Sequence, residues 1–273
     1  MAARSYLYVP GDRPDRLDKA LDRAGDAVIA DLEDAVPHAR KDLALAAVTD
    51  WLAALPRHGP EIWVRIGAGP RAADELAAVS GFADLTGVIL AKASCRGVEE
   101  ADRVLTPEVG VGALVETAAA LLELPELARH PRVRQLGIGE ADLAAELGVA
   151  PGEPAAFGPL RTQLVVASAA AGIAAPTGPV HLDVRDLEGL RTSTAALKRA
   201  GFGARSAIHP DQVAVIEAVF TPTAGEVARA RAAVQAWDAA DAGVVLDEQG
   251  RMVDEAVVRL ARRVVQTADR LNL

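Results

Sequence analysis

The sequence has a single cysteine, Cys95, among its 273 residues. A disulfide framework within the chain is therefore excluded, and a reducing compartment, the cytoplasm, is expected. Long apolar runs are also missing, since the most apolar stretch, residues 164–176, is too short and too rich in alanine to cross a bilayer. Residues 1–13 lack the apolar segment of a signal peptide. These absences predict a soluble protein.

Aromatic residues and positive charge are scarce as well. Aromatics make up 3% of the chain, and 29 Lys and Arg residues face 38 Asp and Glu residues, for a net charge of −9. A general affinity for nucleic acid or for an anionic membrane is therefore not expected. An anionic small molecule stays possible as a substrate if basic residues gather locally. The 51% of hydrophobic residues, mostly small aliphatics, suit helices packed closely on a parallel sheet.

Short apolar runs of β type alternate with longer helical patterns along the first 220 residues. The runs cover residues 5–9, 27–32, 61–66, 87–92, 111–116, 133–139, 178–183 and 204–208. Strands that alternate with helices indicate an α/β fold with a parallel sheet, and eight such units predict a (β/α)8 barrel of the TIM type over residues 1–220. An open doubly wound sheet is the alternative. It is disfavoured because the GIGEAD segment at 137–142 lacks the third glycine of a dinucleotide-binding fingerprint.

Residues 221–273 exceed what the eighth barrel helix needs. They predict a helix, a polar turn and a closing helix. We expect a C-terminal helical extension that packs elsewhere, as a lid over a neighbouring subunit.

Charged residues recur directly after the predicted strands, or on them. Those that we single out are Asp31, Glu33, Asp34, Arg65, Lys92, Glu116 and Asp142. Each taken alone has an ordinary structural explanation, such as a helix N-cap for Asp142 or a solvated rim residue for Lys92. Together they gather at the end of the barrel where barrel enzymes carry their active sites.

Glu116 and Asp142 are the most distinctive pair, because each follows an apolar strand where a side chain turns into the barrel mouth. Two carboxylates suit Mg²⁺, which keeps much of its water, whereas zinc is disfavoured because cysteine and histidine at zinc spacing are missing. The three acids of the VIADLEDAV segment, residues 28–36, are expected to bind the metal's waters or to steer the neighbouring cations. Direct ligation by one of the three is the less favoured alternative. No G-x-S-x-G motif marks a serine nucleophile.

Several motifs in their order along the chain resemble those of the citrate lyase beta-subunit-like proteins of the HpcH/HpaI aldolase and citrate lyase superfamily. They are SYLYVPGDRPDRLDKAL, VIADLEDAV, VRI, VILAK, LVET, DLAAELG, AIHPDQ and RMVD. The resemblance covers nearly the whole chain. It implies a (β/α)8 barrel, Mg²⁺ dependence, and carbon–carbon cleavage or formation on a 3-hydroxyacyl-CoA thioester.

The resemblance also implies roles for residues of the barrel mouth. Glu116 and Asp142 match the metal ligands, and Arg65 matches an arginine that clamps the substrate carboxylate or keto acid. Glu33 and Asp34 match an acidic motif beside the metal, which we take as part of the catalytic machinery.

The resemblance also implies roles for residues outside that acidic cluster. Asp254, in RMVD, matches a C-terminal acid that is contributed to a neighbour's site as a proton donor or acceptor. Such donation predicts a homo-oligomer, a trimer or a hexamer. Arg16 and Lys19 are candidates for the CoA phosphates, and Lys92 is a candidate substrate contact.

The sequence also departs from the pattern of this family. The metal-binding acid lies in GEADL, residues 139–143, where relatives often have GAEDL, so Glu140 is displaced by one position. LAKAS replaces L-P-K-A-E, and Gly67 replaces the asparagine of VRIN. These changes leave the metal ligands and the arginine intact and alter the acyl pocket.

A stand-alone CoA-ester lyase on a malyl-, citramalyl- or citryl-type thioester is the favoured interpretation. A malyl-CoA thioesterase on the same barrel and a carrier-dependent citrate lyase beta subunit are the alternatives. A class II pyruvate or phosphoenolpyruvate aldolase is disfavoured because such relatives lack the RMVD extension. An inactive scaffold is disfavoured by the joint presence of Arg65, Glu116, Asp142 and Asp254.

Overall fold

The computed structural model describes residues 3–56, 58–240, 244–247 and 250–273. The chain divides into two compact units, Met1–Glu217 and Ala218–Leu273, and each is described by itself.

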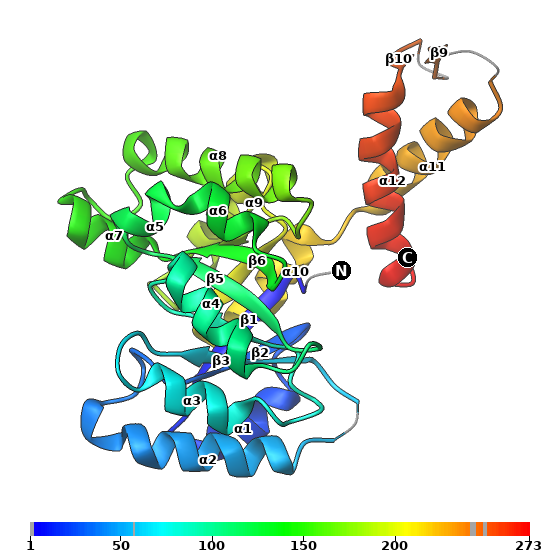
Figure 1. Cartoon of the computed structure of the whole chain (residues 1–273). Helices are drawn as coiled ribbons and strands as arrows, with labels where there is room; N and C mark the ends of the chain where they lie inside the picture. Colours follow the sequence, from blue (N-terminus) through cyan, green and yellow to red (C-terminus); the bar gives the residue numbers. More distant parts are fainter. Residues whose placement is uncertain (1–2, 57, 241–243, 248–249) are drawn as a thin grey trace. The chain divides into compact units, whose positions relative to one another are not determined.

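The first unit is a closed barrel of eight strands in sequence order, each parallel to its neighbours (Figure 1). The strands are β1 (Ser5–Pro10), β2 (Ala27–Asp31), β3 (Glu61–Ile66), β4 (Gly87–Leu90), β5 (Gly110–Val115), β6 (Val133–Ile138), β7 (Thr177–Gly178) and β8 (Ala204–Ala207). The predicted (β/α)8 barrel is therefore confirmed. The seventh strand was predicted over 178–183 but is only two residues long, because Pro179 has no N–H to continue the ladder.

Helices follow the strands around the barrel. They are α1 (Pro14–Leu21), the short 3-10 helix η1 (His38–Arg40), α2 (Lys41–Ala53), α3 (Ala72–Val79), α4 (Cys95–Val104), α5 (Ala118–Leu122), α6 (Leu124–Arg129), α7 (Glu140–Leu147), α8 (Pro154–Ala171), α9 (Leu187–Arg199) and α10 (Pro210–Phe220). Ser94, Thr117 and Asp186 begin α4, α5 and α9 by accepting a hydrogen bond from a backbone amide three residues on.

A small aromatic cluster fills part of the barrel interior. Tyr6 and Trp63 pack edge to face, with ring centroids 6.0 Å apart, and the Tyr6 hydroxyl donates to Gln135 Oε1 at 2.7 Å. Gly87 makes room for Trp63, because a Cβ at this position would lie 2.4 Å from the indole ring. This packed layer leaves the carboxyl ends of the strands free for polar side chains.

The second unit contains α11 (Ala224–Asp238), β9 (Val245–Leu246), β10 (Met252–Val253) and α12 (Glu255–Arg270), orange to red in Figure 1. β9 and β10 pair antiparallel. Thr223 and Glu226 form a capping box at the start of α11. Asp254 caps α12, since its Oδ1 accepts from the Val257 amide at 2.9 Å.

Across the described parts of both units, no helix combines the length and the apolar character that a membrane crossing requires.

Candidate functional site

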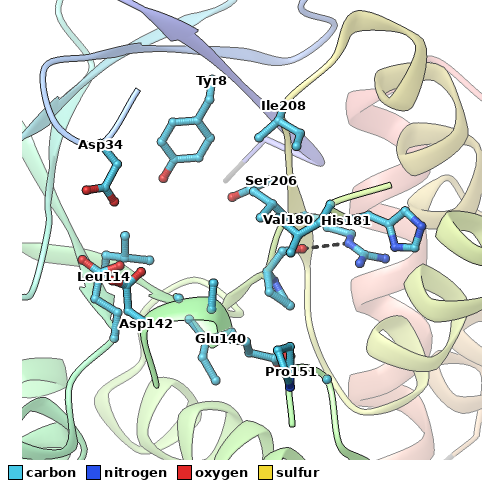
Figure 2. Close-up of a pocket in the computed structure, with 18 of the residues that line it drawn as sticks. Tyr8, Asp34, Leu114, Glu140, Asp142, Pro151, Val180, His181, Ser206 and Ile208 are labelled. Carbon is cyan, nitrogen blue, oxygen red and sulfur yellow. Dashed lines mark hydrogen bonds between the residues drawn. The ribbon is translucent and has the colours of Figure 1, made fainter. Parts of the chain in front are cut away.

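A cavity of about 800 Å³ lies at the carboxyl ends of the barrel strands. We name two parts of its lining. The acidic end comprises Asp31, Asp34, Arg65, Glu116 and Asp142, with Glu33 and Lys92 bound to it, and the basic end comprises Arg161, His181 and Arg205. In Figure 2, Asp34 and Asp142 lie on one side of the cavity, and Val180 and His181 lie on the other. One continuous cavity therefore joins an acid-rich region to a region with two arginines, where Glu140 and Asp183 also line the wall.

Arg65 and Asp31 form a buried ion pair at the acidic end. The two residues are register partners on β3 and β2, so their side chains leave the sheet side by side. Arg65 Nε donates to Asp31 Oδ1 at 2.7 Å, and Nη2 donates to Oδ2 at 2.6 Å. Burial alone would lower the pKa of Arg65, but the hydrogen bond and charge of Asp31 outweigh it and raise that pKa. Asp31 is therefore committed to Arg65.

The remaining edge of the Arg65 guanidinium faces other groups. Nη1 lies 3.0 Å from Glu33 Oε2 and 3.6 Å from Asp34 Oδ2. The guanidinium carbon lies 4.9 Å from the centre of the Tyr8 ring, which fixes its plane by a cation–π contact. Asp31 thus occupies the edge formed by Nε and Nη2, and Nη1 faces Glu33 and Asp34.

Glu33 and Asp34 are adjacent, but their pKa values are shifted in opposite directions. Lys92 Nζ donates to Glu33 Oε1 at 2.9 Å. Burial opposes ionisation of Glu33, but its hydrogen bonds with Asp34 and Lys92 and the charge of Arg65 lower its pKa to about 2. Partial burial and the neighbouring Glu33 raise the pKa of Asp34 to about 6. Asp34 is thus a carboxyl group on the cavity wall that can exchange a proton near neutral pH.

Glu116 follows β5 directly, and Asp142 lies in the first turn of α7. The Lys92 amide donates to Glu116 Oε1 at 2.6 Å, with Lys92 in the left-handed region at φ 46°. Gly139 allows this arrangement, since a Cβ there would lie 2.5 Å from Glu116 Oε2. Burial, and then the charges of Asp142 and Glu33, raise the pKa of Glu116 to about 7.

The acidic end fits a divalent cation. Five carboxylates, Asp31, Glu33, Asp34, Glu116 and Asp142, face two cations, Arg65 and Lys92. No group of three or more potential metal-ligating side chains occurs within the described ranges. Mg²⁺ suits such a site, because it takes one or two carboxylates and keeps several waters. Glu116 and Asp142 are the carboxylates without a cationic side-chain partner, so they are the candidate ligands.

At the basic end, Arg161 and Glu140 form a second arginine–carboxylate ion pair. Arg161 Nε and Nη2 donate to the two carboxylate oxygens of Glu140 at 2.6 and 2.7 Å. Glu140, the displaced acid of the GEADL segment, is thereby bound to α8. His181 Nε2 lies 3.6 Å from Asp186 Oδ2.

The other predicted residues lie outside the cavity lining. Arg16 and Lys19 are exposed on α1. Asp254 belongs to the second unit, where it caps α12. Sequence reasoning did not single out Tyr8 or Arg205, although each lies on a predicted strand. For Arg205 a signal existed, since an arginine within the apolar β8 resembles Arg65 within β3.

Fold and site together define a (β/α)8-barrel protein with a charged cavity at the catalytic end of the barrel. The profile of the HpcH/HpaI aldolase/citrate lyase family matches residues 4–210, and the chain belongs to this family.

Relatives with known names match along nearly the whole chain. A (3S)-malyl-CoA thioesterase from Cereibacter sphaeroides is 32% identical, over 97% of this chain and 94% of the relative. A citrate lyase subunit beta-like protein from Mycobacterium tuberculosis is 35% identical, over 98% and 96%. An L-malyl-CoA/beta-methylmalyl-CoA lyase from Rhodobacter capsulatus is 29% identical, over 97% and 94%.

Among solved structures, CitE from Mycobacterium tuberculosis superimposes with a TM-score of 0.81 at 34% sequence identity, covering 98% of both chains. That crystal contains magnesium, acetoacetate and coenzyme A.

Proposed function

We propose that this protein is a Mg²⁺-dependent carbon–carbon lyase. Its substrate would be a 3-hydroxyacyl-CoA thioester such as malyl-, citramalyl- or citryl-CoA, and its products acetyl-CoA, or a homologue, and an oxo acid. The observation that carries the proposal is the meeting of Glu116, Asp142 and Arg65 in one cavity at the barrel mouth. The ligands of the CitE crystal and the lyase activity named for the Rhodobacter relative support it.

Glu116 and Asp142 would hold the metal, which when bound supplies Lewis-acid stabilisation of the substrate's hydroxyl and oxo oxygens. Arg65 would bind the substrate carboxylate with charge-assisted hydrogen bonds. Tyr8 and Asp31 keep the guanidinium in place during this contact.

The cleavage requires two proton movements. The hydroxyl loses a proton, the carbon–carbon bond breaks to give the oxo acid, and the electron pair remains on the thioester as an enolate that takes up a proton. Asp34, whose pKa is raised to about 6 by partial burial and by Glu33, is suited to accept the first proton. Asp254 of a neighbouring copy is assigned the second, which requires a homo-oligomer, a trimer or a hexamer.

The remaining predicted residues act around this centre. Arg16 and Lys19, exposed on α1, would bind CoA phosphates. Lys92, a predicted substrate contact, forms an ion pair with Glu33 through its ammonium group, so it would mainly neutralise that acid.

A thioesterase is the second candidate, and the Cereibacter relative favours it. In that reaction water attacks the thioester carbon, CoA leaves as the thiol, and the hydroxy acid stays intact. A carrier-dependent citrate lyase beta subunit is the third.

A mass-spectrometric assay separates these candidates. The protein is incubated with Mg²⁺ and with malyl-, citramalyl-, citryl- or 3-hydroxy-3-methylglutaryl-CoA, with EDTA as the control. Acetyl-CoA plus an oxo acid, lost with EDTA, is expected of the lyase. Free CoA plus the intact hydroxy acid indicates the thioesterase. No turnover with any CoA ester would contradict both and direct attention to a carrier protein.

A further inference from the structure

Arg205 is a buried arginine bound to neutral acceptors. It lies on β8 and is 3% exposed. Its Nε donates to the Pro179 carbonyl at 2.9 Å, and its Nη1 donates to Ser193 Oγ at 2.7 Å and Thr194 Oγ1 at 2.8 Å. A longer contact from Nη1 reaches the Leu190 carbonyl at 3.3 Å. Within the described ranges, Arg205 forms no ion pair with a carboxylate.

None of the nearby acids in the part of the chain that the structure describes pairs with Arg205: Asp183, which also lines the cavity, is exposed and accepts from the Arg185 amide at 3.0 Å. Both oxygens of Glu140 accept from Arg161, and Asp186 faces His181. Burial lowers the pKa of Arg205 to about 10, and the charges of Glu140 and Arg161 oppose each other. A cation in this position is desolvated without a compensating anion, which is unfavourable unless a ligand supplies one.

One nitrogen of the guanidinium takes no part in these hydrogen bonds. The four contacts use Nε and Nη1, and none of them uses Nη2. Arg205 lines the same cavity as the acidic end, together with Ser193 and Ser206. Ser206, the next residue of β8, leaves the opposite face of the strand, and in Figure 2 its hydroxyl points toward Tyr8.

We propose that the basic end of the cavity is a subsite for a single carboxylate, bound by Arg205, at the part of the ligand remote from Glu116 and Asp142. Of the esters named in the proposed function, such a subsite selects the citryl type, whose oxo-acid product carries two carboxylates, over the malyl and citramalyl types, whose oxo-acid products carry one. The inference deepens the proposed function and rests on it for the role of the acidic end. One surplus positive charge matches a monoanionic carboxylate better than a phosphate, whose second charge would stay uncompensated.

Matched pairs of oxo acids test the subsite by calorimetric titration of the wild-type protein with Mg²⁺ present. The pairs are oxaloacetate and 2-oxobutanoate, 2-oxoglutarate and 2-oxopentanoate, and 2-oxoadipate and 2-oxohexanoate. Members of a pair have equal carbon number and differ only in the terminal carboxylate. We expect the diacid of at least one pair to bind about tenfold or more tightly than its partner. Equal affinities in all three pairs would overturn the subsite.

Arg205→Met should abolish this preference and leave the affinity for pyruvate unchanged, and Arg205→Lys should retain part of it. Arg191→Met is the control, since Arg191 is an exposed arginine on α9, the helix that supplies Ser193 and Thr194, and does not line the cavity. A preference that persists in Arg205→Met overturns the assignment. If that variant does not fold, the wild-type pairs still decide.

A further titration distinguishes a carboxylate of the oxo acid from a phosphate of CoA as the anion that Arg205 binds. CoA and dephospho-CoA are titrated into wild type and Arg205→Met. A loss of CoA affinity, with no diacid preference in the wild type, would assign Arg205 to a phosphate and reject the carboxylate subsite. If no oxo acid binds more tightly with Mg²⁺ than without it, while a diacid still binds in an Arg205-dependent way, the proposed function fails and the subsite stands.

Discussion

Arg65 and Arg205 lie on strands of the same barrel, line the same cavity and are both buried, at 9% and 3% exposure. Their surroundings differ in one respect. Arg65 has Asp31 on its Nε edge, whereas Arg205 has a carbonyl and two hydroxyls within 3.0 Å. The pKa of Arg65 is raised by Asp31 against the effect of burial, and the pKa of Arg205 is lowered by burial. Burial makes each guanidinium costly to desolvate. A carboxylate of the chain compensates that cost at Arg65, and none among the described residues does so at Arg205.

The same contrast applies to the two ends of the cavity. The acidic end has more carboxylates than cations, and the basic end has a cation without an anion. An ion or ligand that supplies the missing charge is stabilised at each end. A magnesium ion would offset two of the three surplus negative charges that five carboxylates and two cations leave at the acidic end, and a carboxylate would offset the charge of Arg205, so a ligand that spans the cavity would bind each end through a different charge.

The largest expected effect comes from removing each arginine in turn. Arg65→Met leaves the fully buried Asp31 without its partner, and we expect a loss of about 3–5 kcal/mol in the free energy of unfolding. Arg205→Met removes hydrogen bonds to neutral acceptors and also removes a desolvated charge, so the expected loss is about 1–2 kcal/mol. Urea denaturation measures both. Equal losses would show that the Asp31 partner does not distinguish the two sites.

The next effect concerns the surplus negative charge of the acidic end. Burial raises the pKa of Glu116 to about 7 from its ordinary 4.5. An acid with a raised folded-state pKa favours the protonated folded state, so stability is lost as the pH rises from about 5 to 7 and the loss is complete above 7. For the metal-free protein this contribution is at most about 3 kcal/mol. Thermal melts across pH 5 to 8, with and without Mg²⁺, measure it.

Glu116→Gln should flatten that pH dependence and make the metal-free protein more stable at pH 8, while removing the stabilisation by Mg²⁺ and most of the activity. The control is Glu108→Gln, at an exposed position before β5. A variant that keeps full activity at physiological Mg²⁺ would refute the metal assignment of Glu116.

The barrel and much of its acidic end could be predicted from the sequence, because both depend on local order. Apolar runs alternating with helical patterns specify eight strands, and residues just after a strand lie at its carboxyl end. Glu116 and Asp142 line the cavity for this reason. The pairing of Asp31 with Arg65 depends on the β2–β3 register, which the separate runs do not reveal.

The basic end could not be predicted in the same way. Arg161 lies within α8, and Arg205 binds a carbonyl after β7 and two hydroxyls of α9, so the contacts join segments far apart in sequence. β7 is short because Pro179 has no N–H for the ladder, and an apolar pattern such as that of residues 178–183 predicts burial but not backbone hydrogen bonds. The left-handed backbone of Lys92 had no glycine or asparagine to mark it.

A smaller effect is expected when one acid is displaced without any change in charge. Gly139→Ala places a Cβ 2.5 Å from Glu116 Oε2 and 2.6 Å from Glu116 Cβ, so Glu116 has to shift from its present position. We expect at least a tenfold loss of Mg²⁺ affinity with a stability loss of about 1–3 kcal/mol. Gly158→Ala, where a Cβ meets nothing within 4 Å, is the control and should keep the affinity. Unchanged Mg²⁺ binding in Gly139→Ala would mean that Glu116 does not need its present position to bind the ion.

The smallest effect is expected at Lys92, the second cation of the acidic end, where the backbone and the ammonium group hold different acids. The amide donates to Glu116 and Nζ donates to Glu33, with φ at 46°. Lys92→Gly removes the ammonium group but adopts this backbone without strain, so we expect stability within about 1 kcal/mol of wild type and unchanged Mg²⁺ affinity. Lys92→Val also lacks the ammonium group, and its β-branched side chain disfavours positive φ, so it should lose about 1–3 kcal/mol and weaken Mg²⁺ binding as the amide moves away from Glu116. Denaturation and calorimetric Mg²⁺ titration of the two variants separate the role of the amide from that of the ammonium group. If Lys92→Gly also loses Mg²⁺ affinity, the ammonium group rather than the amide positions the metal ligand. The acidic end would then depend on Lys92 as closely as it depends on Arg65.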